Sequence, residues 1–270
     1  MTLRLFQVDA FAERVFEGNP AAVVPLEQWL DDATLQAIAE ENQLSETAFF
    51  APVADGYRLR WFTPVSEVDL CGHATLACAH VLFHHLGFDQ DVVRFQTRSG
   101  ELSVRRTDTG LAMDFPALAS EPVAVPGDLI DGFSGRKPEA VFRGQDYLAL
   151  LPGPGDVLGL EPDFTALARL DRRGVIATAP GEDCDFVSRC FYPKLGVAED
   201  PVTGSAHCQL APFWAARLGR TELSARQVST RTGRLRCRVV GERVELLGSA
   251  VTYLEGELSR GAAEYGGSGP

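Results

Sequence analysis

The chain has 270 residues, 45% of them hydrophobic, so it can bury a core as one large domain or two of ordinary size. Its 37 acidic residues outnumber its 25 basic ones, giving a formal net charge of −12 that disfavours nucleic acid and anionic lipid as partners. No segment approaches the roughly eighteen apolar residues of a membrane span, and the N-terminus lacks the apolar run of a secretion signal, so we expect a cytoplasmic protein.

In chain order, the first informative stretch is a helical pattern over residues 31–41 followed by the segment "ENQLSETAFF". Glu46 stands between this helix and the apolar strand that begins with "TAFF", where a carboxyl group can be partly buried. Burial raises the pKa of a carboxyl group toward the range in which it accepts and returns a proton. Glu46 is therefore a candidate acid/base, against the alternative that it is a solvated acid at a strand edge.

The next element is a strand, "YRLRWF", which ends at a proline turn and leads through a loop to a helix. The apolar spacing predicts this helix from His73 to Leu86, with Gly87 as its C-terminal stop. His80 and His84 lie one turn apart on it, which raises a metal site as an alternative. No further ligand stands at a recognisable metal spacing, so we expect no metal and histidines that are packed or solvated. Antiparallel strands are predicted after the helix at "VVRFQT", "ELSVRR" and "LAMDF".

The second half of the chain repeats the first. "RWFTP" returns as "RCFYP", "CGHATLACA" lines up with "TGSAHCQLA", and "TRSGEL" returns as "TRTGRL", at offsets of 129, 132 and 133 residues. Three matches in one order with slowly drifting offsets indicate a duplication. We expect two similar domains, residues 1–117 and 118–258, with a last strand able to cross back to the first domain. Residues 259–270 are expected to form a flexible tail.

The repeated pattern predicts a second strand at "DFVSRCF" and a second helix from Ser205 to Leu218, stopped by Gly219. Pro212 lies inside this helix and should kink or divide it, for no reason visible in the sequence. Further strands are predicted at "QVSTRT", "LRCRVV" and "VELLG". The expected fold class is α+β, with antiparallel sheet wrapped on a helix in each domain and a cleft between the domains.

Both predicted helices open at a glycine, Gly72 or Gly204, where unpaired backbone N–H groups bind carboxylates and other anions. Glycine also allows a ligand to approach the backbone closely. These two helix starts therefore predict a pocket for a small acid.

The polar residues at the two starts differ: Cys71 and His73 in the first half correspond to Thr203 and Ser205 in the second. A racemase with two opposed bases would need matched groups, usually two thiols, and only one is present. A single carboxyl group that shuttles a proton fits better. The candidates for that base are Glu46, Glu199 and Asp200.

Four long motifs carry a family resemblance, which runs from about Phe6 to Leu258: "FQVDAFAERVFEGNPAAVV", "LSETAFF", "RWFTPVSEVDLCGHATLACAHVL" and "EDPVTGSAH". They resemble the phenazine biosynthesis PhzF-like isomerases. The resemblance implies the diaminopimelate epimerase fold, in which two pseudo-symmetric domains each curl a sheet around a central helix. It also implies a site between the domains, no cofactor and commonly a homodimer.

In the namesake of that family, the enzyme isomerises trans-2,3-dihydro-3-hydroxyanthranilate by moving a proton along a conjugated ring. By resemblance, Glu46 takes the proton from one carbon and returns it to another. His73, Asp200 and Ser205 would hold the substrate and assist the proton transfer. The small acid substrate would also be bound by Gly72, Thr203 and Gly204 at the helix starts.

Three alternatives stay open. Cys71 matches a catalytic thiol of the epimerase relatives, and a thiol at a helix start has a lowered pKa, so a Cys71-dependent epimerase or dehydratase is one. A small-acid binding protein without turnover is another. The repeated arginines, Arg60 and Arg189, are the third question: either one binds a substrate carboxylate through its fork, or both tie a strand to a loop, which the duplication favours.

Overall fold

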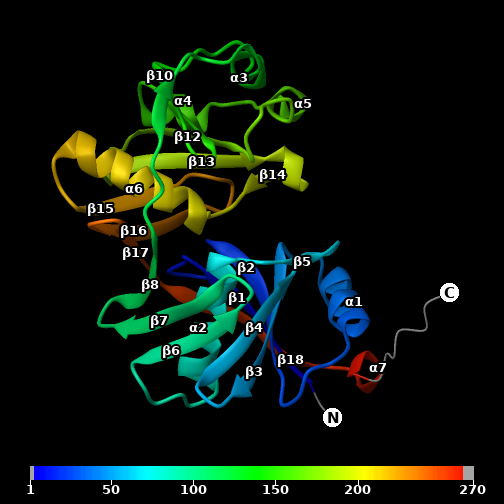
Figure 1. Cartoon of the computed structure of the whole chain (residues 1–270). Coiled ribbons are helices and arrows are strands. Elements are labelled where there is room, and N and C mark those ends of the chain that lie inside the picture. The colour runs from blue at the N-terminus through cyan, green and yellow to red at the C-terminus, as the bar shows by residue number, and fades with distance from the viewer. Residues whose placement is uncertain (1–2, 264–270) are drawn as a thin grey trace. The chain divides into compact units, whose positions relative to one another are not determined.

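The computed structural model describes residues 3–263, which form two compact units of strands and helices (Figure 1). Unit 1 is the chain up to Asp114 together with the chain from Gly248 onward, and unit 2 is Phe115–Leu247. The change of unit thus comes three residues before the expected division, and the last strand belongs to unit 1. Between residues 3 and 263, no helix has the length and apolar character needed to cross a membrane.

Unit 1 is built mainly from strands around one long helix. Its strands are β1 (Leu3–Ala10), β2 (Asn19–Pro25), β3 (Glu46–Val53), β4 (Gly56–Phe62), β5 (Glu67–Val68), β6 (Val92–Thr97), β7 (Gly100–Thr107), β8 (Gly110–Pro116), which runs into unit 2, and β18 (Ala250–Leu258). Its helices are α1 (Asp32–Asn42), α2 (Gly72–His85) and the short α7 (Arg260–Ala263). The expected flexible tail therefore includes a helical turn, and residues 264–270 lie outside the described residues.

Unit 2 has the same plan with shorter additional helices. Its strands are β9 (Glu121–Val123), β10 (Ala140–Arg143), β11 (Tyr147–Leu150), β12 (Val175–Pro180), β13 (Phe186–Tyr192), β14 (Val197–Asp200), β15 (Glu222–Gln227), β16 (Gly233–Val240) and β17 (Arg243–Gly248), whose last residue is counted in unit 1. Its helices are α3 (Gly127–Gly132), α4 (Pro154–Leu158), α5 (Phe164–Leu167), the 3-10 turn η1 (Pro193–Leu195) and α6 (Gly204–Leu218).

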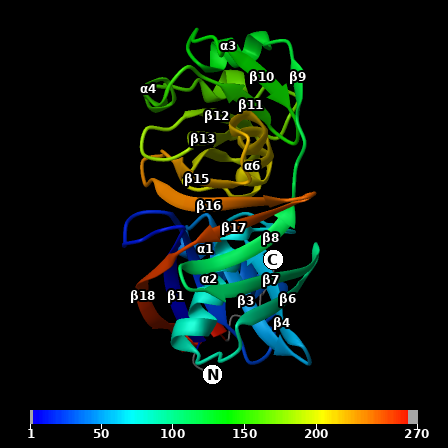
Figure 2. The ribbon, with the colours of Figure 1, turned by 90° about the vertical axis from the view of Figure 1, so that its left-hand side faces the viewer.

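Strand pairing confirms the predicted duplication. Parallel pairs β2–β3 and β4–β6 of unit 1 correspond to β11–β12 and β13–β15 of unit 2, and the other repeated pairs are antiparallel. The outer strand of each series follows a passage of the chain from one unit to the other: β18 pairs with β1 in unit 1, and β9 pairs with β10 in unit 2 (Figure 2). The fold is therefore the predicted α+β class, with a similar, mostly antiparallel strand arrangement in each unit.

A buried helix forms the centre of each unit. In unit 1, α2 packs against β1, β2, β3, β7 and β18, and its residues from His73 to Phe83 are buried. It ends before Gly87, whose φ of 69° lies in the left-handed region that glycine adopts without strain. In unit 2, α6 packs on β15 and β16 and is capped by Gly219 with a φ of 67°. Both predicted helices and both glycine stops are confirmed.

Pro212 does not divide α6, which is continuous from Gly204 to Leu218. A proline in a helix leaves the carbonyl four residues earlier without its usual partner. That carbonyl belongs to Cys208, and it accepts a hydrogen bond of 2.9 Å from the backbone N–H of Leu118. The proline thus frees the Cys208 carbonyl to accept a hydrogen bond that joins the segment after β8 to α6.

One predicted strand is wrong. The segment "QVSTRT" at residues 227–232 was expected to be extended, but β15 ends at Gln227. The following residues form a turn in which Thr232 has a φ of 55° and its backbone N–H bonds to the carbonyl of Ser229. The alternation of side chains in this segment reflects a polar turn and not a half-buried strand.

The repeated arginines tie strands to loops, as the duplication favoured. Arg60 on β4 binds both carboxylate oxygens of Glu67 on β5 at 2.7 Å. Arg189 on β13 binds both oxygens of Glu199 on β14 at 2.8 Å. All four side chains are largely buried, between 11% and 18% exposed, and such forked pairs fix geometry as well as charge.

We expect Arg189→Met to lower the free energy of unfolding by about 2–3 kcal/mol, the scale of a lost charged hydrogen bond that leaves buried acceptors unpaired. Arg189 also donates to the carbonyl of Leu160 at 2.8 Å, so its loss leaves a backbone acceptor, as well as Glu199, without a donor. Arg60→Met should cost less, because Glu67 keeps Arg98 at 2.6 Å. Urea unfolding of the two variants side by side measures this, and equal losses would contradict it.

Candidate active site

The structure brings together three of the predicted residues in unit 1. Glu46 is the first residue of β3, Cys71 is the N-cap of α2, and His73 lies in the first turn of α2. The Glu46 Oε2 atom lies 3.1 Å from His73 Nε2, and Cys71 Sγ lies 3.5 Å from His73 Nδ1. The side chains of Glu46 and His73 are only 18% and 8% exposed. A carboxylate, an imidazole and a thiol therefore form one buried group.

Glu46 and His73 form an ion pair. Burial alone would raise the pKa of Glu46, but the charge of His73 and the polar contacts with His73 and Cys71 outweigh it and hold that pKa below its usual value. Burial likewise opposes the charge on His73, but the neighbouring Cys71 and Glu46 raise its pKa well above the usual value. The expectation that burial raises the pKa of Glu46 is therefore wrong: the carboxylate is ionised beside an imidazolium.

The expectation of a lowered thiol pKa is also wrong. Cys71 is buried, and desolvation together with the negative charge of Glu46 raises the pKa of its thiol to about 11. The helix start favours a thiolate, but burial has the larger effect. Cys71 is thus a neutral thiol near neutral pH.

Glu46 keeps an acceptor available. Its buried Oε2 atom lies at ion-pair distance from His73 but accepts no hydrogen bond of regular geometry from residues 3–263. An acceptor of this kind costs free energy unless a ligand or proton engages it. This oxygen therefore has the His73 ring as its charged neighbour and receives no regular hydrogen bond from the described residues.

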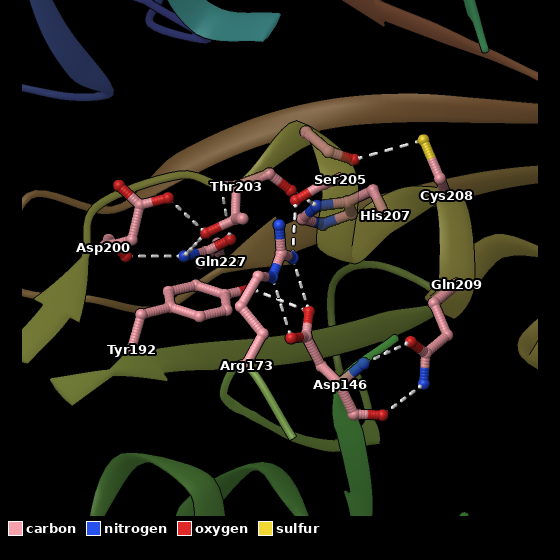
Figure 3. Close-up of polar contacts among 11 residues, drawn as sticks. Asp146, Arg173, Tyr192, Asp200, Thr203, Ser205, His207, Cys208, Gln209 and Gln227 are labelled. Carbon is pink, nitrogen blue, oxygen red and sulfur yellow. Dashed lines mark hydrogen bonds and ion pairs between the residues drawn. The ribbon is translucent and has the colours of Figure 1, made fainter. Parts of the chain in front are cut away.

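Unit 2 holds the other predicted residues at the start of α6 (Figure 3). Thr203, the N-cap, donates its hydroxyl proton to Asp200 Oδ2 at 2.5 Å. Gln227, fully buried, accepts from the Thr203 backbone N–H at 2.9 Å and donates to the Asp200 carbonyl at 2.6 Å. These bonds fix the loop between β14 and α6 and orient the Asp200 carboxylate.

Ser205 in the first turn of α6 contacts a charged pair that the sequence analysis missed. Arg173 donates to Ser205 Oγ at 3.0 Å and to the two oxygens of Asp146 at 3.0 Å and 2.6 Å (Figure 3). A signal exists: each of these charged residues shortly precedes an apolar run, "YLALL" or "VIATA". These runs are β11 and β12, which pair in parallel, so residues before them come close together.

The third candidate base, Glu199, already has both carboxylate oxygens paired with an arginine. Both of its carboxylate oxygens bind Arg189, so its role is structural. The helix starts at Gly72 and Gly204 lie where they were predicted, as the first residues of α2 and α6. The structure thus assembles Glu46, Cys71, Gly72 and His73 in unit 1 and Asp200, Thr203, Gly204 and Ser205 in unit 2.

Of the two helix histidines considered as metal ligands, His80 is packed and His84 is exposed. His80 lies 2.9 Å from the Thr252 hydroxyl, and burial lowers the pKa of His80 to about 3. Among the described residues, the group compact enough to hold a metal is Glu46, Cys71 and His73, whose ligand atoms lie within 4.8 Å of one another. A metal there would have to displace the protons of His73 and Cys71.

Comparison with known proteins places the chain in a family. The family model described as phenazine biosynthesis-like protein matches residues 8–256. An uncharacterised isomerase of Pseudomonas aeruginosa is 57% identical, with 96% of this chain and 99% of that protein covered. A PhzF-family phenazine biosynthesis protein from Enterococcus faecalis has a crystal structure with a TM-score of 0.94 and 46% identity, over 96% of this chain and 100% of that one.

A more distant structure shows the fold alone. A hydroxyproline epimerase from Agrobacterium vitis is 12% identical with a TM-score of 0.61, over 97% of this chain and 95% of that one. The two-unit architecture is therefore shared with epimerases. The matches over nearly the full length, together with the conserved plan of both units, show that the chain belongs to the PhzF-like family of phenazine biosynthesis-like isomerases.

Proposed function

We propose that this isomerase moves a proton between two carbons of a small unsaturated carboxylic or amino acid, with Glu46 as its single acid/base. The observation that carries the proposal is the buried ion pair of Glu46 and His73, in which Oε2 of Glu46 accepts no regular hydrogen bond from the described residues. An ionised carboxylate with an open acceptor is ready to take a proton.

The protonation states also indicate the kind of substrate. A carboxylate with a lowered pKa is a weak base, so it removes a proton only from a C–H group whose anion is delocalised. Conjugation with a double bond and a carboxyl group provides that delocalisation. The same lowered pKa makes protonated Glu46 a good acid, which favours rapid return of the proton to a second carbon.

The resemblance to the family assigns the remaining roles. Asp200 and Ser205 hold the substrate and assist the proton transfer, while Gly72, Thr203 and Gly204 contribute helix starts that bind its carboxylate. The proposal requires Glu46 and the unit 2 residues to reach the same substrate. We infer, again from the resemblance, that the enzyme needs no cofactor and acts as a cytoplasmic homodimer.

Replacement of Glu46 tests the proposal directly. In D2O with trans-2,3-dihydro-3-hydroxyanthranilate as the probe, wild type should form the isomer and incorporate deuterium at carbon. Glu46→Gln should slow this by about 10²–10⁴-fold, the usual contribution of a general acid/base. Glu40→Gln, a change at an exposed glutamate on α1, is the control. NMR measures the label.

Two results would contradict the proposal. Exchange by Glu46→Gln at the wild-type rate would remove Glu46 from the mechanism. Binding of the probe by wild type with no exchange at any carbon would instead favour a small-acid binding protein.

Cys71→Ser distinguishes the single-base mechanism from a thiol mechanism. Because the Cys71 thiol is neutral with a pKa of about 11, we expect this variant to keep exchange within a few-fold of wild type. A second measurement uses a substrate deuterated at the carbon that loses its proton. If one base both removes and returns the proton, part of that deuterium should appear in the product. A loss comparable to that of Glu46→Gln would support the Cys71-dependent epimerase or dehydratase instead.

The ion pair itself can be tested without substrate. In Glu46→Gln, burial remains but one of the two groups that raise the pKa of His73 is lost, so that pKa should fall from its wild-type value. In wild type that pKa is raised above its ordinary value of 6.5, so the stabilisation from His73 is present below 6.5 and is lost as the pH rises through the folded value. NMR titration of the histidine ring measures both proteins, and an unchanged pKa would contradict the ion pair.

A further inference from the structure

The contact between Glu46 and His73 in unit 1 has a counterpart in unit 2. Thr47 pairs with Phe62, and Val175 pairs with Phe191, so these two strand starts have the same register against the repeated phenylalanines. Glu46 directly precedes Thr47, and Arg173 lies two residues before Val175.

The partners also correspond. His73 and Ser205 are each the second residue of the central helix of their unit. Where unit 1 has a carboxylate next to an imidazole, unit 2 has a guanidinium next to a hydroxyl.

Arg173 is held rigidly. Its Nε and one terminal nitrogen bind the two oxygens of Asp146, whose side chain is 1% exposed. The Tyr192 ring lies against the guanidinium, with Cζ 5.0 Å from the ring centroid, and its hydroxyl donates to Asp146 Oδ2 at 3.3 Å. The guanidinium therefore has one orientation, and in that orientation it donates to Ser205 (Figure 3).

The hydroxyl proton of Ser205 is left free to donate. A serine in a helix commonly gives its proton to the carbonyl four residues earlier, as Thr75 does to Cys71 at 2.6 Å. For Ser205 that carbonyl belongs to Pro201, and it accepts from the Ser229 hydroxyl at 2.7 Å. Within residues 3–263, no acceptor is recorded for the Ser205 proton. Arg173 occupies the acceptor side of the same oxygen, so the proton must point away from the cation.

We propose that Arg173, held by Asp146, is a positioning residue that sets Ser205 as a hydrogen-bond donor to an anionic oxygen of the substrate. A hydroxyl that accepts from a cation is a stronger donor, because the two bonds polarise one another. Such a donor stabilises negative charge that increases on the substrate oxygen when the carbanion forms. The inference rests on the proposed function, because it assumes an anionic substrate that gains charge during proton transfer.

The test is a double-mutant cycle on Arg173→Lys and Ser205→Ala, assayed with trans-2,3-dihydro-3-hydroxyanthranilate. Lysine keeps the charge next to Asp146 but lacks the fork that reaches both Asp146 and Ser205. Each single variant should lower kcat by about 10²-fold, near the cost of losing one preorganised donor, with a smaller change in KM. The double variant should lose no more than Ser205→Ala, because Arg173 acts through Ser205.

Arg143→Lys is the matched control, because Arg143 pairs with Glu121 at the surface of the same unit. Losses that multiply in the double variant, or wild-type kcat in Arg173→Lys, would overturn the inference. A purely structural role would lower the melting temperature of Arg173→Lys without the coupling to Ser205.

Glu46→Gln, assayed in parallel, distinguishes failure of the inference about Arg173 from failure of the proposed function. An inactive Glu46→Gln with a fully active Arg173→Lys refutes the role of Arg173 alone. An active Glu46→Gln refutes the proposed function. Binding of anthranilate by calorimetry adds a readout without turnover: affinity should fall in both single variants and no further in the double variant. Wild type that neither converts the probe nor binds anthranilate overturns both proposals.

Discussion

A forked ion pair between a strand arginine and a glutamate on the next strand precedes the central helix in both units. In unit 1, Arg60 holds Glu67 just before α2, and in unit 2, Arg189 holds Glu199 just before α6. Because a planar guanidinium binds both carboxylate oxygens, the loop cannot slide along the strand. This contact fixes the position of the first turn of each helix. The candidate site residues lie in or beside that turn.

The duplicated framework carries two different sets of side chains. Unit 1 places a carboxylate and an imidazolium together, and unit 2 places a guanidinium between a buried carboxylate and a hydroxyl. An unpaired buried charge is strongly destabilising, so each replacement required a complementary partner within its own unit. The pairing of Arg173 with Asp146 satisfies that requirement as fully as the pairing of Glu46 with His73. Divergence in chemistry was thus compatible with an unchanged backbone plan.

Much of the fold was predictable because the chain contains two copies of one pattern. The central helices, their glycine stops and most strands after them follow from local spacing. The short helices α3, α4 and α5 and the strands β10 to β12 show no repeat that is visible in the sequence, and they were not predicted. Pro212 was expected to kink or divide α6; the helix is not divided, and the carbonyl that the proline frees accepts from Leu118, which is distant in sequence.

The candidate site residues could be proposed from motifs, but their charges could not. The motifs gave Glu46, His73, Asp200 and Ser205 as candidates, whereas the pKa of Glu46 depends on His73, a neighbour that only the fold brings to 3.1 Å. Arg173 was missed for the same reason, because its role depends on Asp146, which lies in the bend before the neighbouring strand β11. Burial alone gave the wrong direction for the pKa of Glu46, and the helix start alone gave the wrong direction for the pKa of Cys71.

In the proposed mechanism, the ion pair would allow a weak base to serve as a proton shuttle. When Glu46 accepts a proton it becomes neutral, and the charge of His73 loses its partner at the moment the substrate becomes an anion. The negative charge therefore moves from the carboxylate to the substrate, and no additional buried charge is created. In this proposal, the imidazolium then stabilises the carbanion until the proton returns. A neutral Glu46 with a raised pKa, the arrangement expected from burial alone, could donate a proton but could not begin this cycle by removing one.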